Sequence, residues 1–107
     1  MSKVSMPRPR YIAFRIDAAT PLPRRAVGNA LRAASKGWPE DQAPKLTRYE
    51  WPHGIVRVEH TEQADAKRLL AAITAMDGIP VKVETLSASG TLKALTTRIG
   101  VLTKRTD

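Results

Sequence analysis

Two hydrophobic patterns alternate along this chain, and their order limits the possible folds more than any single motif does. Strict apolar–polar alternation is typical of a strand with one buried face, and a period of about 3.6 residues is typical of an amphipathic helix. Strand patterns occupy residues 11–17, 55–60 and 81–85, with a weaker, edge-like one at 45–50. Helical patterns occupy residues 24–36, 62–77 and a stretch that begins at residue 92. The predicted order is strand, helix, strand, strand, helix, strand, helix.

The first six segments have the split βαβ arrangement of ferredoxin-like and RNA-recognition-motif folds. Two helices with apolar faces would cover one side of a four-stranded antiparallel sheet. We therefore predict an α+β class, a ferredoxin-like βαββαβ sandwich with an extra C-terminal helix. The expected organisation is a basic flexible tail at 1–10, a single α/β sandwich domain at 11–100 and a C-terminal tail at 101–107.

The apolar positions of these segments define a predicted core. Proline suits the first turn of a helix, so Pro23 is expected to start the first one, and Gly78 with Pro80 to stop the second. The expected core positions are Ile12, Phe14, Ile16, Val27, Ala30, Leu31, Ala34, Val56, Val58, Ala66, Leu69, Leu70, Ile73 and Met76.

Length and composition exclude several classes of protein. A chain of 107 residues suits one domain with its own core. The absence of Cys excludes disulfides and thiolate metal sites, and His53 and His60 have no carboxylate cluster in the sequence to complete a zinc site. No apolar run approaches the roughly 18 residues of a membrane span. The first ten residues lack the apolar core of a secretory signal, so a cytoplasmic location is expected.

The net charge is +8, from 18 Lys and Arg against 10 Asp and Glu, and the excess lies at the two ends. Residues 1–16 and 93–106 each hold four basic residues and no acidic one. The stretch 17–92 is nearly neutral, with ten basic and nine acidic residues. This pattern suits an anionic partner, and RNA or DNA is the commonest one in the cytosol. The alternative is that both ends are merely solvated tails.

Residues 81–100 combine a strand, a run of small residues and the start of a basic helix. Such a junction is suited to binding a phosphate group, because helix N-termini attract anions. The simpler interpretation is that Ser89 or Thr91 only caps the helix and that Gly90 relaxes the turn with a positive φ. The predicted RNA-binding residues of this region are Ser89, Gly90, Thr91, Lys93 and Arg98.

The predicted topology brings the two basic ends together. In the usual order of this fold, the last strand lies beside the first and antiparallel to it. The end of the last strand, near Ser87, would then adjoin the beginning of the first, near Tyr11. The expected neighbours are Arg8 and Arg10 on one side and Ser89, Gly90 and Lys93 on the other.

No catalytic constellation is recognisable, so the chain itself is not expected to be catalytic. Ser87, Ser89 and Thr91 are nucleophile types, but neither His lies near them in the sequence. Acylphosphatase-like chemistry also uses a ferredoxin-like fold, but it would need an Arg in the loop after the first strand. The first Arg after that strand is Arg24.

The sheet face away from the helices has too few aromatic residues for RNA recognition by base stacking. Residues 54–58 contain none, and Tyr11 is a single ring. RNA would therefore be recognised through its backbone and shape, by Arg and Lys. This face, which carries Tyr11, Ala13 and Ile55, is also available to another protein. Arg15 and Arg57 are either solvated or in contact with a partner.

Three blocks together resemble the ribonuclease P protein component 2 family of archaea and eukaryotes. The first is Arg10-Tyr11-Ile12, and the second is Gly54-Ile55-Val56-Arg57. The third is Ser89-Gly90-Thr91-Leu92-Lys93, similar to the V-S-G-T-[IL]-K block of that family, although Ala88 stands where the family usually has Val. The resemblance covers about residues 10–98.

The resemblance implies a non-catalytic RNA-binding subunit of ribonuclease P, in which the RNA component uses Mg²⁺ to remove the 5′ leader of precursor tRNA. It implies a subunit that pairs with itself and binds a barrel-shaped ribonuclease P protein in a heterotetramer, with no cofactor of its own. Another RNA-binding module of the ribosome or of RNA processing is the alternative. The predicted RNA-binding residues are Arg8, Arg10, Ser89, Gly90, Thr91, Lys93 and Arg98, and the predicted partner-binding residues are Tyr11, Ile55 and Arg57.

Overall fold

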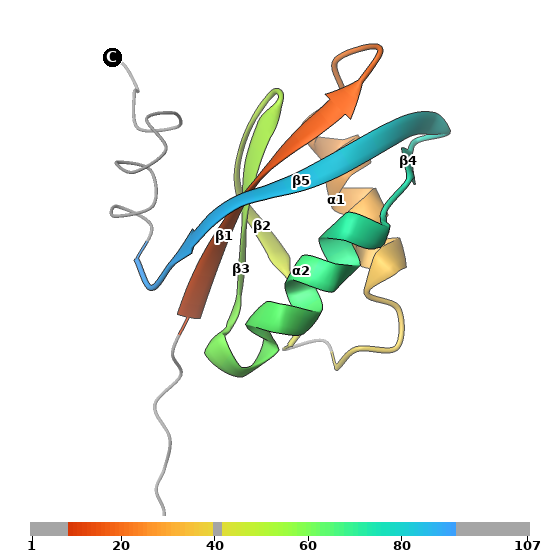
Figure 1. Ribbon diagram of the computed structural model, residues 1–107. Coiled ribbons are helices and arrows are strands. Elements are labelled where there is room, and N and C mark those ends of the chain that lie inside the picture. The colour runs from red at the N-terminus through yellow and green to blue at the C-terminus, as the bar shows by residue number, and fades with distance from the viewer. Residues whose placement is uncertain (1–8, 40–41, 92–107) are drawn as a thin grey trace, which may run out of the picture.

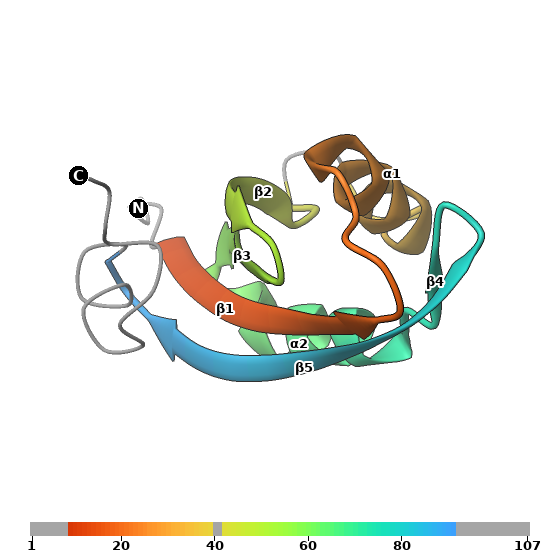
Figure 2. The same cartoon turned by 90° about the horizontal axis from the view of Figure 1, so that it is seen from above.

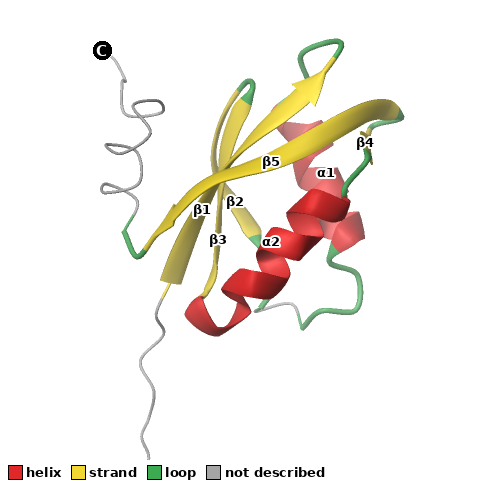
Figure 3. Cartoon of the chain, viewed as in Figure 1, coloured by secondary structure: helices red, strands yellow, loops and turns green. Residues whose placement is uncertain are grey.

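The structure, a computed structural model, describes residues 9–39 and 42–91 (Figure 1). Within them, five strands form an antiparallel sheet in the order β2-β3-β1-β5-β4. The strands are β1 (Pro9–Ala18), β2 (Lys45–Glu50), β3 (His53–Glu59), β4 (Ala75–Met76) and β5 (Ile79–Ser89). The helices are α1 (Arg24–Ala34) and α2 (Gln63–Ala72), with the 3-10 turn η1 (His60–Glu62) before α2 (Figure 3).

The α+β class and the antiparallel pairing of the last strand with the first are confirmed, but the predicted number of strands is wrong. The helix expected at 62–77 ends at Ala72, and Ile73 is already extended, with φ −75° and ψ 119°. Asp77 (φ 54°) and Gly78 (φ 78°) form a turn, and β4 pairs with β5 through Ala75↔Pro80 and Met76↔Ile79. An Asp-Gly pair with positive φ at both residues favours a tight hairpin, and this preference overrides the helical spacing of Ile73 and Met76.

The last strand is longer than predicted. A bulge interrupts its apolar–polar alternation, so the second half does not follow the pattern of the first. β5 continues to Ser89, so Ser87 and Ser89 belong to the strand and not to a turn. The register between β1 and β5 shifts after Ala13, which leaves Leu86 between the paired positions Thr85 and Ser87. Val83 and Ala88, an odd number of residues apart, therefore both pack on the core. The expected helix from residue 92 lies outside the described residues.

Both helices pack against the same apolar cluster, which β1 crosses. Ile12, Phe14 and Ile16 of β1 are fully or almost fully buried, as predicted. Val27 and Leu31 approach this cluster from α1, and Leu69 and Leu70 approach it from α2. β5 runs beside β1 and curves along its length (Figure 2). No helix in the described part of the chain is long and apolar enough to cross a membrane.

Gly54 shows how closely the sheet and its core side chains approach. It pairs with Phe14 across β1 and β3, and a Cβ at Gly54 would lie 2.5 Å from the Phe14 Cζ atom. The aromatic ring therefore covers the backbone of β3 where a side chain would otherwise stand. This contact accounts for the glycine that opens the block from residue 54 to 57.

Candidate nucleic-acid interface

The start of β1 and the end of β5 lie side by side, as the topology predicts. Tyr11 pairs with Ser89. A Cβ added at Gly90 would lie 3.0 Å from Arg10 Nη1, so the Arg10 guanidinium reaches the backbone just beyond β5. Residues about 80 positions apart in the sequence thus share one end of the sheet. Arg8, Lys93 and Arg98, predicted to join them, lie outside the described residues.

The turn after β5 differs from the prediction in one respect. Gly90 does not have a positive φ, which in the described residues is restricted to Gly37, Gly78 and Asp77. A side chain at Gly90 is instead opposed by the nearby Arg10 guanidinium. The Thr91 amide donates a 3.4 Å hydrogen bond to Ser89 Oγ, as serine side chains often accept in turns.

A row of four side chains crosses the sheet on the face away from the helices, and we call it the basic row. Directly paired residues of neighbouring strands place their side chains on the same face. The pairs Ser89↔Tyr11, Tyr11↔Arg57 and Arg57↔Lys45 therefore align these four side chains across β5, β1, β3 and β2. Arg57 and Lys45 are like charges directly opposite each other, an arrangement that destabilises a sheet. Strand pairing alone does not favour such a pair, and the Glu59 carboxylate lies on the same face, two residues beyond Arg57.

The second row of this face is apolar at its centre. Its burial contradicts the expectation that Ala13 and Ile55 are available to another protein. The row consists of Ser87, Ala13, Ile55 and Arg48 in register. The exposed fraction of Ala13 is 1% and that of Ile55 is 0%, so neither is an exposed apolar contact as expected. Of the predicted partner-binding residues, Tyr11 and Arg57 are half-buried and Ile55 is fully buried.

The third row reverses the balance of charge. Glu84, Arg15, His53 and Glu50 are in register, so two carboxylates accompany one arginine. Partial burial lowers the pKa of His53, Arg15 lowers it further, and Glu50 opposes them. His53 is therefore neutral at neutral pH and adds no positive charge. Near the start of β1 this face carries Arg57 and Lys45 together with the Glu59 carboxylate opposite Pro9, and near the end of that strand it is balanced or negative.

Sequence reasoning did not select Lys45 and Arg48 for this face. Lys45 begins an edge strand whose apolar residues do not alternate, and a register shift separates it from Arg48. Their places beside Arg57 and Ile55 depend on which strands are neighbours and in which register. No local pattern in the sequence carries that information.

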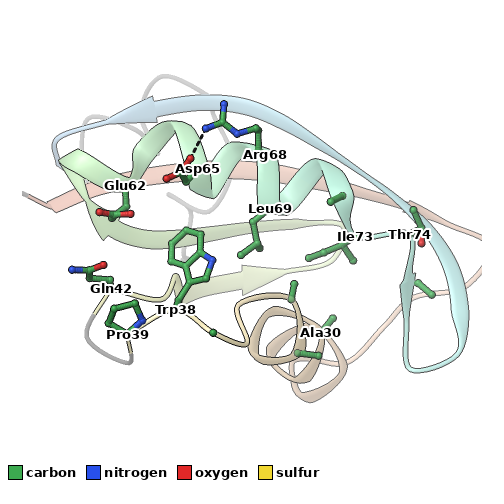
Figure 4. A pocket seen from close by; sticks show the side chains of 15 residues that line it. Ala30, Trp38, Pro39, Gln42, Glu62, Asp65, Arg68, Leu69, Ile73 and Thr74 are labelled. Atoms are coloured by element: carbon green, nitrogen blue, oxygen red, sulfur yellow. Dashed lines mark hydrogen bonds and ion pairs between the residues drawn. The ribbon is translucent and has the colours of Figure 1, made fainter.

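A groove of about 900 Å³ lies between α1 and α2 on the other side of the molecule (Figure 4). Ala30, Trp38 and Leu69 supply part of its apolar lining. Glu62 and an ion pair between Asp65 and Arg68 also line it. Because these acidic side chains face the groove, it does not favour a phosphate group.

The described residues thus form an α+β sandwich with a basic row on the sheet face away from the helices. No protein-family model matches the chain, and no curated protein sequence matches it. Among solved structures, the chain is similar to a chain in the cryo-EM structure of yeast ribonuclease MRP, with a TM-score of 0.63 and 15% sequence identity. The alignment covers 92% of this chain and 95% of that chain. At this identity the similarity shows the fold.

Proposed function

We propose that this protein is a non-catalytic RNA-binding subunit of a ribonuclease P type ribonucleoprotein, which supports the RNA in removing the 5′ leader of precursor tRNA. The observation that carries the proposal is the basic row. Arg10 pairs with Val58 and so lies on the other face, beside Gly90 at the same end of the sheet. The similarity of fold to a chain in the structure of yeast ribonuclease MRP supports it, as do the three sequence blocks.

The proposed mechanism is electrostatic. Arg10, Arg57 and Lys45 would lie against phosphates, neutralise their mutual repulsion and allow the RNA to fold at a lower Mg²⁺ concentration. Arg is suited to this task because its planar guanidinium group binds two phosphate oxygens at once. Tyr11 lies between Ser89 and Arg57 in the basic row, where its ring would stack on one unpaired base.

The proposed assembly contains a second copy of this chain and a barrel-shaped protein subunit, in the cytoplasm. The protein binds no cofactor of its own, and Mg²⁺ is used by the RNA. Of the residues that the sequence assigned to a protein partner, Tyr11 and Arg57 are here proposed to contact RNA instead, and the Ile55 side chain is buried.

Reconstitution tests the proposal. Catalytic RNA and partner proteins would be assayed for precursor-tRNA cleavage at limiting Mg²⁺, with and without this chain. We expect faster cleavage with the chain, and a smaller gain with the Lys45→Gln/Arg57→Gln variant. The matched control is Lys67→Gln/Lys82→Gln, which removes two exposed cations outside the basic row. Equal cleavage with and without the wild-type chain would contradict the proposal.

Arg10 provides a finer test within the same assembly. We expect Arg10→Ala to weaken RNA binding and to lower the slope of log affinity against log salt by about one unit. An unchanged slope would show that Arg10 does not contact a phosphate. Sequencing of the RNA that co-purifies with the chain would separate ribonuclease P from another RNA-processing or ribosomal assembly.

A further inference from the structure

A second positively charged surface lies on the helical side of the molecule, in a cleft between α1 and the segment that leads into β2. The cleft has a volume of about 770 Å³. Within the described ranges, no acidic side chain lines it, and Glu40 and Asp41 fall outside those ranges. Its basic residues are Arg24, Arg25, Arg32, Lys36 and Lys45. We call it the α1 cleft.

The spacing along α1 places Arg24 and Arg32 on one flank of the helix. Arg24, Gly28 and Arg32 follow at four-residue intervals, so they lie one above the other on the helix surface. Arg24 and Arg32 are separated by roughly 12 Å along the helix axis. A nucleic-acid strand that rises about 3.4 Å per nucleotide would pass three or four nucleotides in that length.

Two features of this flank are unfavourable for the helix itself. Arg24 and Arg25 occupy the first turn of α1, which contains no acidic residue, although the positive end of the helix dipole favours acids there. Gly28 lies inside the helix, where glycine is less stable than alanine. An added Cβ at Gly28 would meet no atom within 4 Å, so packing does not require a glycine. A ligand that approaches the helix backbone between arginines would account for both features.

Within the described residues, neutral oxygen atoms orient the guanidinium groups of Arg24 and Arg32 in the α1 cleft. Arg24 Nη2 donates a 3.0 Å hydrogen bond to the Leu46 carbonyl oxygen, and Arg32 Nη1 donates one of 3.1 Å to Asn29 Oδ1. Each bond uses one of the five donors of its guanidinium group. The Tyr49 hydroxyl donates to the Leu22 carbonyl oxygen and joins β2 to the segment before α1. The cleft walls are therefore held together by contacts that leave most arginine donors available.

We propose that the α1 cleft binds the phosphate backbone of an RNA strand, as a second contact separate from the basic row. Lys45 belongs to both surfaces, because it pairs with Arg57 in the sheet and lines the cleft at the β2 edge. One RNA strand would thus pass around this edge from the basic row to α1. The proposal rests on the proposed function in assuming that the anionic partner is RNA.

Binding to model RNAs tests the α1 cleft directly. The probes are fluorescein-labelled poly(U) of about 20 nucleotides and an RNA duplex of about the same length, titrated between about 50 and 200 mM salt. We expect Arg25→Gln/Arg32→Gln/Lys36→Gln to lower the salt slope by about two to three units. The control Lys67→Gln/Arg68→Gln/Lys82→Gln removes three exposed cations elsewhere and is expected to change the slope by less than about one unit.

A second variant tests the backbone approach without removing charge. Gly28→Leu fills the open space on the helix and is expected to fold, with a melting temperature at or above that of the wild type. We expect its RNA affinity to fall several-fold at an unchanged net charge. Wild-type affinity in Gly28→Leu, or equal salt slopes in the two triple variants, would overturn the proposal. So would a cleft variant that keeps RNA binding but loses an acidic protein partner.

The two proposals fail separately. If the chain does not stimulate precursor-tRNA cleavage while the cleft variant still loses affinity for the model RNAs, the proposed function is wrong and the α1 cleft stands. If the chain stimulates cleavage and the cleft variant binds RNA like its control, only the α1 cleft is wrong.

Discussion

The two helices perform the same structural task with different surface residues. α1 contributes Val27 and Leu31 to the core cluster, and α2 contributes Leu69 and Leu70. On the outer side, α2 has an acidic residue in its first turn, Asp65, which pairs with Arg68 one turn later. α1 has arginines in its first turn, a glycine in its middle and no acidic residue.

The surface residues of α2 can be explained by helix stability, whereas those of α1 cannot. An acid near a helix N-terminus and an oppositely charged pair three residues apart both stabilise a helix. The surface of α2 is therefore what folding alone favours. The corresponding positions of α1 are unfavourable for the helix, and they line one cleft. The comparison thus supports the proposed RNA contact at α1 without reference to any relative.

The largest expected effect tests whether the two helices contribute equally to the stability of the core. Leu31→Ala in α1 and Leu70→Ala in α2 each remove a buried side chain, so each should lower the free energy of unfolding by about 2–5 kcal/mol. Urea unfolding measures both losses. A loss below about 1 kcal/mol for Leu31→Ala alone would mean that α1 is not an equal part of the core.

The next test asks whether the charges of the two helices differ in function. Arg32→Gln in α1 should weaken binding to poly(U) about three- to tenfold, equivalent to about 0.7–1.4 kcal/mol. Arg68→Gln in α2 should weaken it less than about twofold, because Arg68 is paired with Asp65. Fluorescence anisotropy at one low salt concentration compares the two variants. Equal losses would remove the functional distinction between the helices.

Local sequence patterns predicted most of the fold, and they failed where two signals conflicted. β2 occupies the predicted residues 45–50, and α1 begins at the predicted Arg24. The helical spacing of Ile73 and Met76 concealed the hairpin centred on Asp77 and Gly78. The alternation of β5 appeared to end early because the bulge at Leu86 changes which residues face the core.

The candidate site was less predictable, because charge along a sequence does not describe charge on a surface. Residues 17–92 are nearly neutral in total, yet six of their ten basic residues lie in the basic row and the α1 cleft. Lys45 reaches Arg57 only through the pairing of β2 with β3. Topology did allow one long-range contact to be predicted, that of Arg10 with the end of β5.

Exchanging glycine and alanine should change the free energy of unfolding by a smaller amount, and in opposite directions in the two helices. Gly28→Ala in α1 should raise the free energy of unfolding by about 0.5–1 kcal/mol, because alanine is the better helix former and its Cβ meets no neighbour. The reciprocal change, Ala71→Gly at an exposed position of α2, should lower it by a similar amount. Urea unfolding of both variants provides the measurement. A destabilised Gly28→Ala would show that the glycine serves the fold.

The smallest expected effect concerns the helix dipoles. Arg25→Glu places an acid in the first turn of α1 and should raise the free energy of unfolding by about 0.3–1 kcal/mol at low salt. Asp65→Lys makes the opposite change in α2 and should lower it by a similar amount, with some further loss from the ion pair to Arg68. Both effects should shrink as salt is added, because exposed charges are screened. If Arg25→Glu is more stable and yet binds RNA more weakly, Arg25 serves binding at the expense of the helix. If it is less stable, the arginine supports the fold, and the contrast between α1 and α2 no longer points to a function.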